Sequence, residues 1–534
     1  MKRREFLSRG VPAATLPFLV GGFRCTAYGR SRLLDVLAAA GAETDRVLVL
    51  IQLNGGNDGL NTVIPLDQYS AIAAARSNIM IDEASVLRLT NATGLHPAMT
   101  GLQGLYNNGA LAVVQGVSYP NPNLSHFRAT DIWLSGADYN QVLNTGWAGR
   151  YLDAEFSGFP DGYPNSTMPD PLAIQIGSVV TPGLQGPSVS MGMAITNPNA
   201  SYTLPGGSDT PPDTPAGHEL TFIREVAQQT QLYGSSVKTA AGKGKNLSTL
   251  YPVSGQNTLA DQLKIVAQLI AGGLKTRIYV VNLGGFDTHS AQVDATGGTA
   301  TGAHALLLGK LSLAIAAFQD DLHLLGSDGR VVGMTFSEFG RRIKSNASLG
   351  TDHGTAAPLF VFGNSVNAGL LGTNPALPAA ATVNDNLAMQ FDFRWVYASL
   401  LQDWFGADPA ELGDVLQTPL FDPSGPHPLQ VIKPSAVASS GDAGSPPEEY
   451  RLEQNYPNPF NPATVIAYSL AGTSGVTLEV FNEAGELVRT LVHAEQPAGA
   501  YQVEFNASGL PSGAYFYRLR AGDFVRTMKL LYIK

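Results

Sequence analysis

Carboxylate and imidazole side chains occur as close pairs at two glycine-flanked positions of this chain. Asp352 and His353 are adjacent, and Asp287 and His289 are two residues apart. Carboxylate oxygens and imidazole nitrogens are common metal ligands, and neighbouring glycines let the backbone approach a ligand closely. We therefore expect these four residues, together with Asp58, to hold one or two divalent ions, with zinc first and manganese or calcium as alternatives.

Ser125 is the candidate catalytic nucleophile. It lies beside His126 in a turn rich in proline and asparagine, where its hydroxyl could meet a bound metal and attack an ester. Serine is also a favoured N-cap, so Ser125 could equally begin a helix over residues 126–134 and have no chemical role. Both interpretations stay open from the sequence.

Further polar residues near these positions are candidate substrate-binding residues. Glu338 and Arg341 could bind an anionic substrate group or a second metal, or they could form the ion-paired start of a helix. Asn54 and Asn57 could donate to a bound oxyanion, although asparagine in a glycine-rich turn is first of all a turn residue. We include His126 in this substrate-binding set.

The candidate residues follow four apolar runs, at residues 47–53, 111–117, 278–283 and 331–336. Continuous apolar runs suit strands that are buried on both faces of a parallel sheet. In such sheets ligands bind beyond the carboxyl ends of the strands. The sequence therefore predicts that the candidate residues meet at one rim of a sheet.

Helical segments alternate with these runs. Residues 97–107, 259–274 and 303–325 carry apolar residues at helical spacing, and residues 394–405 close the pattern. This alternation predicts an α/β fold with a mainly parallel sheet. Between residues 153 and 260 Gly, Pro, Ser, Thr and Asn dominate, so we expect an irregular insert there, either a cap over the rim or a peripheral subdomain.

Composition limits the class of protein. A chain of 534 residues exceeds what one hydrophobic core usually organises, so we expect at least two domains. The 44% of hydrophobic and 14% of charged residues indicate a globular protein. A net charge of −10 argues against a nucleic-acid partner, and the single cysteine excludes a disulfide within the chain.

The two ends of the chain differ from its centre. Residues 1–45 begin with paired arginines before a short, weakly apolar stretch, which is typical of a twin-arginine export signal with its leader and is too short for a transmembrane span. The alternative is a basic start to an amphipathic helix. Residues 434–449 have a linker composition, and the short alternating runs of residues 450–534 predict an antiparallel β-sandwich.

The sequences Asn455-Tyr-Pro-Asn-Pro-Phe-Asn-Pro and Leu510-Pro-Ser-Gly-Ala-Tyr-Phe resemble the type A C-terminal sorting domain of the type IX secretion system. This resemblance covers about the last 80 residues. It implies transport through the periplasm and across the outer membrane by that machinery, followed by secretion or attachment at the outer cell surface.

The centre of the chain, residues 46–433, resembles the family DUF1501 of the alkaline phosphatase and sulfatase superfamily. The resemblance rests on the motifs Leu53-Asn-Gly-Gly-Asn-Asp-Gly, Leu124-Ser-His-Phe, Gly146-Trp-Ala-Gly-Arg, Gly284-Gly-Phe-Asp-Thr-His, Phe336-Ser-Glu-Phe-Gly-Arg and Thr351-Asp-His-Gly. It implies an alkaline-phosphatase-like α/β sandwich in which Asp58, Asp287, His289, Asp352 and His353 hold metal and Ser125 is the nucleophile.

This resemblance implies a metal-dependent hydrolase of phosphate or sulfate esters, whose substrate would be a small molecule or a glycan ester. The superfamily's order of ligands ends in a further histidine, and the sequence offers no match for it. In addition, Asn54 stands where the first aspartate is common, and Asp58 follows it. The alternative hypothesis is a non-catalytic, secreted or surface binding protein that keeps the fold with a degraded site.

Overall fold

The computed structural model describes residues 17–20, 23–26, 45–199, 212, 214–407, 409–417, 429–433, 450–452, 455, 458, 460–483 and 485–533. The chain divides into two compact units, residues 1–435 and 436–534. The paired arginines of the expected export signal and the expected linker lie outside the described residues. The boundaries that we expect at residues 45, 433 and 449 therefore stay predictions.

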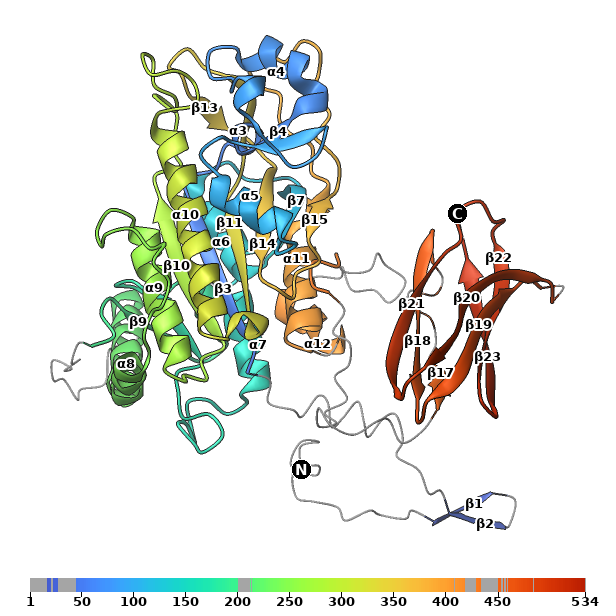
Figure 1. Ribbon diagram of the computed structural model, residues 1–534. Helices are drawn as coiled ribbons and strands as arrows, with labels where there is room; N and C mark the ends of the chain where they lie inside the picture. Colours follow the sequence, from blue (N-terminus) through green and yellow to red (C-terminus); the bar gives the residue numbers. More distant parts are fainter. Residues whose placement is uncertain are drawn as a thin grey trace. The chain divides into compact units, whose positions relative to one another are not determined.

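A nine-stranded sheet forms the centre of the first unit (Figure 1). Its strand order is β15-β7-β14-β11-β3-β10-β8-β9, with β16 beside β7. The strands are β3 (Val47–Asn54), β7 (Leu111–Ser118), β8 (Ala173–Ile176), β9 (Gly192–Ile195), β10 (Ile278–Gly284), β11 (Val331–Ser337), β14 (Ala357–Phe362), β15 (Gly369–Leu371) and β16 (Phe391–Asp392).

The sheet is mainly parallel. Strand β3 pairs in parallel with β10 and β11, and only β14 runs antiparallel to its two neighbours, β11 and β7. Every residue of β7 and β11 is buried, which fits their continuous apolar sequences. The predicted α/β fold is confirmed, and the four predicted apolar runs are the strands β3, β7, β10 and β11.

Helices pack on this sheet in two groups. The first group, α5 (Thr100–Asn107), α9 (Thr258–Ala271) and α10 (Ala303–Leu324), lies in front of the sheet in Figure 1, and α10 contacts the other two. The second group also shares contacts and consists of α6 (His126–Ser135), α7 (Trp147–Glu155), α11 (Phe393–Ser399), the π-helix Leu400–Trp404 and α12 (Pro409–Leu416). No helix in the described part of the chain has the length and apolar run needed to cross a membrane.

Smaller elements complete the first unit. The hairpin of β12 (Arg341–Ser345) and β13 (Thr351–His353) follows β11 and carries three of the candidate residues, Arg341, Asp352 and His353. The other elements are β1 (Pro17–Val20), β2 (Phe23–Thr26), α3 (Gly59–Thr62), β4 (Val63–Pro65), α4 (Tyr69–Arg76), β5 (Leu87–Arg88), β6 (Thr93–Leu95) and the 3-10 helices Leu66–Gln68, Glu83–Ser85, Pro182–Leu184 and Asp328–Arg330.

The expectation of an irregular insert at residues 153–260 is wrong in part. This stretch contains β8, β9 and α8 (Pro215–Lys243), a helix of 29 residues. Thr214 caps α8 by accepting a hydrogen bond from the Gly217 amide, and Pro215 occupies its first turn. Threonine, serine and glutamine are frequent in α8, so the sequence lacks the apolar periodicity that indicates a helix.

The second unit is built from two antiparallel sheets, as expected for a β-sandwich. Their strand orders are β17-β18-β21 and β20-β19-β22-β23, and the sheets share one buried apolar core. The strands are β17 (Arg451–Leu452), β18 (Ala463–Leu470), β19 (Ser474–Phe481), β20 (Leu487–Gln496), β21 (Gly499–Asn506), β22 (Gly513–Ala521) and β23 (Phe524–Tyr532).

Candidate metal centre

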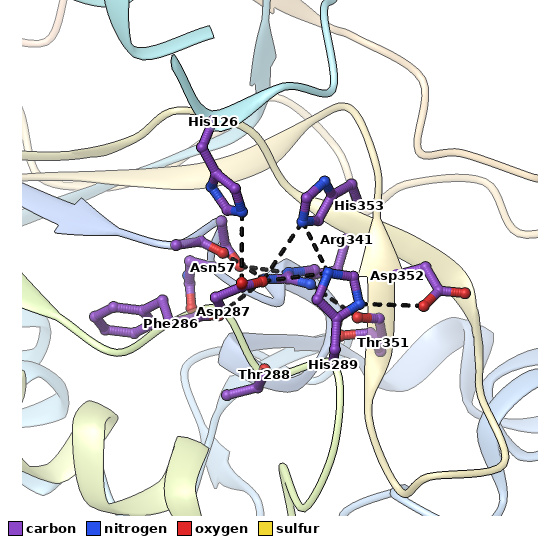
Figure 2. A network of polar contacts seen from close by, with 12 residues as sticks. Asn57, His126, Phe286, Asp287, Thr288, His289, Arg341, Thr351, Asp352 and His353 are labelled. Atoms are coloured by element: carbon purple, nitrogen blue, oxygen red, sulfur yellow. Dashed lines mark hydrogen bonds and ion pairs between the residues drawn. The ribbon is translucent and has the colours of Figure 1, made fainter. Parts of the chain in front are cut away.

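Three chain segments bring one aspartate and three histidines together beyond the carboxyl ends of the strands (Figure 2). Asp287 and His289 lie in the turn after β10, His353 ends β13, and His126 begins α6 after β7. The predicted convergence at one rim of the sheet is therefore seen for these side chains. We call His126, Asp287, His289 and His353 the four-residue cluster.

Ligand atoms of His126, Asp287 and His353 all lie within 4.8 Å of one another, and His289 adjoins two of these residues. Asp287 Oδ1 is 3.3 Å from His289 Nε2 and 3.4 Å from His353 Nε2, and Asp287 Oδ2 is 3.5 Å from His126 Nε2. The two Nε2 atoms of His289 and His353 are 2.9 Å apart. In a tetrahedral zinc site with bonds of about 2.0–2.1 Å, neighbouring ligand atoms are about 3.3–3.4 Å apart. His126, Asp287 and His353 suit such an ion, and His289 is the fourth ligand that we propose.

Each histidine of the cluster is oriented through its other ring nitrogen. Carbonyl and carboxylate oxygens only accept hydrogen bonds, so an Nδ1 that faces one carries the proton and leaves Nε2 as a free ligand atom in the neutral ring. Such acceptors orient metal-binding histidines in many sites. The Nδ1 acceptors are Glu338 Oε1 for His126 at 2.8 Å, the Leu124 carbonyl for His353 at 2.8 Å and Asp352 Oδ1 for His289 at 3.2 Å.

Electrostatics also favour the protonation states that a metal requires. Burial raises the pKa of Asp287, but its hydrogen bond with Arg341 and the nearby histidines outweigh burial, so this pKa lies below its ordinary value. Burial lowers the pKa of His353, and the neighbouring Arg341, His126 and His289 lower it further. Asp287 is therefore ionised and His353 neutral at neutral pH, as metal ligands are.

We propose other roles for three residues than those expected from the sequence. Asp352 faces His289 as a hydrogen-bond acceptor, and its side chain is 59% exposed, so we leave it out of the proposed ligand set. His126, which we expected to bind substrate, groups with Asp287 and His353, so we include it in the proposed ligand set. Glu338 is buried and bonds to His126 and to the Gly55 amide, so it supports the site and is not open to a substrate.

Asp58 lies outside the four-residue cluster and is already neutralised. It is 1% exposed, and Arg76 Nη1 donates to both of its carboxylate oxygens at 2.9 Å. Gln292 Nε2 donates to Asp58 Oδ2 at 2.6 Å. Burial raises the pKa of Asp58, yet Arg76, His304 and these hydrogen bonds hold it below its ordinary value. We therefore leave Asp58 out of the proposed ligand set.

Arg341 is a buried clamp, which differs from the expected substrate contact. Its side chain is fully buried, and its donors are spent within the protein. The acceptors are the carbonyls of Gly55, Gly56, Phe286 and Thr351 together with Asp287 Oδ1, which lies 2.7 Å from Nη2. Arg341 thus connects the turns after β3 and β10 with β13.

The remaining candidates lie at the edge of this arrangement. Asn57 is buried, and its Oδ1 accepts from Thr62 and His304, so it faces the interior. Asn54 is the last residue of β3, and its carbonyl accepts from the Phe286 amide at 3.0 Å. Ser125 occupies the N-cap position of α6 without a side-chain cap bond, and it is exposed.

Gly55 permits the close approach of two of these turns. Its φ is +123°, a conformation that other residues rarely adopt. A Cβ atom at this position would lie 2.2 Å from the Asp287 amide nitrogen. A side chain at residue 55 would therefore displace the turn that carries Asp287 and His289.

The two carboxylates that orient histidines lead to a testable prediction. We expect Glu338→Gln and Asp352→Asn each to weaken metal binding by about 10–100-fold, because an amide no longer stabilises the Nδ1 proton as a carboxylate does. Metal affinity is measured by competition with a chelator. Asp328→Asn is the matched control, since Asp328 bonds to His323 Nδ1 at 2.8 Å away from the cluster. Equal affinities in all three variants would contradict this role.

Comparisons with known proteins agree with both resemblances. Residues 213–407 match the family described as protein of unknown function, DUF1501, and residues 454–534 match the secretion system C-terminal sorting domain. The recognition of these two families is confirmed. The DUF1501 match includes Asp287, His289 and His353. His126 lies before residue 213, where the match begins. No curated protein matches the chain at a significant level.

Solved structures give distant similarities. A sulfatase from a Pseudoalteromonas species is 10% identical with a TM-score of 0.30 and covers 90% of this chain and 89% of its own. An alkaline phosphatase from the Antarctic bacterium TAB5 is 10% identical with a TM-score of 0.25, covering 60% and 92%. A surface component of the type IX secretion system of Porphyromonas gingivalis is 16% identical with a TM-score of 0.13, and the match spans 16% of this chain and only 12% of that one.

The sorting domain also determines where the protein is found. Its presence at residues 454–534 indicates export by the type IX machinery and a secreted or outer-surface location. The expected localisation is therefore confirmed. The twin-arginine route across the inner membrane stays a prediction.

Proposed function

We propose that this protein is a secreted or surface-attached, metal-dependent hydrolase of phosphate or sulfate esters. Its chain combines a segment that matches DUF1501 with a secretion sorting domain. The observation that supports this proposal is the four-residue cluster, in which His126, Asp287 and His353 place ligand atoms within 4.8 Å of one another and His289 lies beside Asp287 and His353. A set of three nitrogens and one oxygen favours zinc, and manganese is the alternative.

The residues of the chain have separate tasks in this proposal. His126, Asp287, His289 and His353 would hold the ion, which supplies Lewis-acid polarisation of an ester oxygen and lowers the pKa of a bound water toward about 7. Ser125 is the proposed nucleophile because it directly precedes His126 and its side chain makes no cap bond. Of its two chain neighbours, His126 belongs to the cluster, and the carbonyl of Leu124 accepts a hydrogen bond from His353 Nδ1.

A non-catalytic binding protein remains the second candidate, and one observation favours it. Asp58, which the resemblance implied as a ligand, is paired with Arg76 and Gln292. A second metal ion would therefore find one of its carboxylates occupied. A protein can keep this fold after it has lost catalytic activity, because activity depends on the residues of the site.

Metal content and turnover together test the proposed function. The full-length protein and the variants His126→Ala and His353→Ala are analysed for bound metal and for hydrolysis of aryl phosphates and sulfates with zinc, manganese or calcium. We expect stoichiometric metal in the wild type and a loss of affinity and turnover of more than about 100-fold in both variants, since removing a ligand exceeds the effect of removing its support. His323→Ala is the control, because this side chain is 76% exposed and lies outside the cluster.

A wild-type protein that binds none of the three metals and hydrolyses neither class of ester would contradict the hydrolase. Metal binding that is unchanged in His126→Ala would contradict the proposed ligand set. Stoichiometric metal without turnover of any ester would favour the non-catalytic protein.

A further inference from the structure

Phe127, the residue after His126, is unusually exposed. It is 91% exposed, the highest value for any large hydrophobic side chain in the part of the chain that the structure describes. Scattered exposed apolar residues are normal on protein surfaces. This one differs because its neighbour in the chain is a proposed metal ligand, so its backbone lies next to the site.

The backbone that carries Phe127 is attached to the cluster on the N-terminal side. The Leu124 carbonyl accepts from His353 Nδ1, and the His126 ring contacts Glu338 and Asp287. Phe127 then lies in the first turn of α6. An aromatic ring has few torsions to lose when a ligand contacts it.

A second segment brings further exposed apolar side chains to the same turn. Arg128 donates to the carbonyls of Tyr139 and Gln141 and pairs with Asp131. These bonds hold residues 139–142 beside the first turn of α6. Within this segment Tyr139 is 45% exposed and Val142 is 75% exposed. Arg128 therefore links two segments that each carry exposed apolar side chains.

We propose that Phe127 is a substrate-binding residue that contacts a ring in the alcohol part of the ester. The inference rests on the proposed function, in which the anionic group is held at the cluster and the alcohol part extends outward past α6. Aromatic side chains pack on the apolar faces of rings with a specific geometry, which a short alkyl chain cannot offer. The substrate class is thus an ester of a ring-bearing alcohol, either a sugar or an aryl alcohol.

Kinetics with ring-bearing and ringless esters test this inference in the full-length protein. Phenyl phosphate, glucose 6-phosphate and ethyl phosphate, or the corresponding sulfates, are compared in wild type, Phe127→Ala and Phe127→Tyr. We expect Phe127→Ala to raise KM for a ring-bearing ester by about threefold to tenfold, while kcat and the KM for the ethyl ester stay within about twofold. The ring ester that is affected distinguishes a sugar from an aryl substrate, and Phe127→Tyr should keep the wild-type KM.

A binding measurement separates this inference from the hydrolase itself. The dissociation constants of benzylphosphonate and methylphosphonate, which are not hydrolysed, are measured by calorimetry in the same variants. Val253→Ala is the control, because Val253 is 72% exposed and lies outside the cluster. Weaker binding of benzylphosphonate alone in Phe127→Ala supports the inference even if the wild type hydrolyses no ester.

Equal effects of Phe127→Ala on ring-bearing and ringless ligands would overturn the inference, and so would no effect on either. If the wild type hydrolyses esters and Phe127→Ala gives either of these results, the proposed function stands and the role of Phe127 is rejected. A wild type that neither hydrolyses an ester nor binds benzylphosphonate overturns both.

Discussion

Replacing Arg76 by methionine is expected to lower the free energy of unfolding of the first unit by about 3–5 kcal/mol. The Arg76 side chain has 0% exposure, and it donates to both oxygens of Asp58 and to the carbonyls of Ile343 and Arg342. Methionine keeps much of the volume but leaves Asp58 as a buried charge without its cation. The loss therefore comes from an uncompensated carboxylate more than from lost packing.

The pH dependence of this effect has a definite sign. In the wild type the pKa of Asp58 lies below its unfolded value, so the pair stabilises the fold above the unfolded pKa of about 3.9 and loses this contribution as the pH falls through the lower folded pKa. Without Arg76, burial is the dominant influence and raises the pKa of Asp58. The deficit of Arg76→Met should therefore be largest at neutral pH and shrink as acid protonates Asp58.

Urea unfolding at several pH values measures this prediction. All four tryptophans, Trp133, Trp147, Trp395 and Trp404, lie in the first unit, so tryptophan fluorescence reports on that unit alone. Arg88→Met is the matched control, because Arg88 and its partner Glu83 have side chains that are 51% and 47% exposed. An exposed pair contributes only about 0–1 kcal/mol. Equal losses in the two variants would contradict the importance of the buried pair.

The strands were predictable from the sequence because burial on both faces leaves a continuous apolar run. Strand β3 was expected over residues 47–53 and spans Val47–Asn54, and β11 was expected over residues 331–336 and spans Val331–Ser337. Helix α8 was not predicted because few of its described side chains are buried. Tyr233 and Val237 are among the buried ones. A helix with so narrow an apolar stripe gives little periodic signal.

The candidate site was predictable in its location but less so in its assignments. The turns after β10 and in β13 were identified because carboxylate and imidazole residues lie close together in the sequence there. Sequence proximity cannot show which oxygen faces which ring. Asp58 and Asp352 were both expected to be ligands. In the structure Asp58 is ion-paired with Arg76, and Asp352 faces the Nδ1 atom of His289.

His126 was expected at this rim, because the run at residues 111–117 precedes it, but its role could not be read from the sequence. It is far from the other histidines in the sequence, and it follows β7, a strand parallel to β10 in the same sheet. Residues after parallel strands meet at one rim, yet the sequence does not show which ring faces which carboxylate.

Arg341→Lys is expected to weaken metal binding by about 10–100-fold while the protein stays folded. Lysine keeps the positive charge but replaces a planar group with several fixed donors by a single ammonium, which cannot reach all of the acceptors that Arg341 bonds. Those acceptors lie in the turn after β3, in the turn after β10 and in β13. The substitution should therefore loosen Asp287, whose Oδ1 is 2.7 Å from Arg341, relative to His353.

Chelator competition measures the metal affinity of this variant, and tryptophan fluorescence confirms that its first unit is folded. Arg330→Lys is the matched control, because Arg330 donates to the Ile270 carbonyl at 2.9 Å away from the ligand-bearing turns. A second comparison uses Asp287→Asn, which changes the metal ligand and leaves Arg341 in place. It separates metal binding by Asp287 from the linking of the turns by Arg341. Metal affinity in Arg341→Lys that equals that of Arg330→Lys would show that the clamp serves folding alone. An affinity between those of Arg330→Lys and Asp287→Asn is the expected result, because the loosened carboxylate still reaches the ion part of the time.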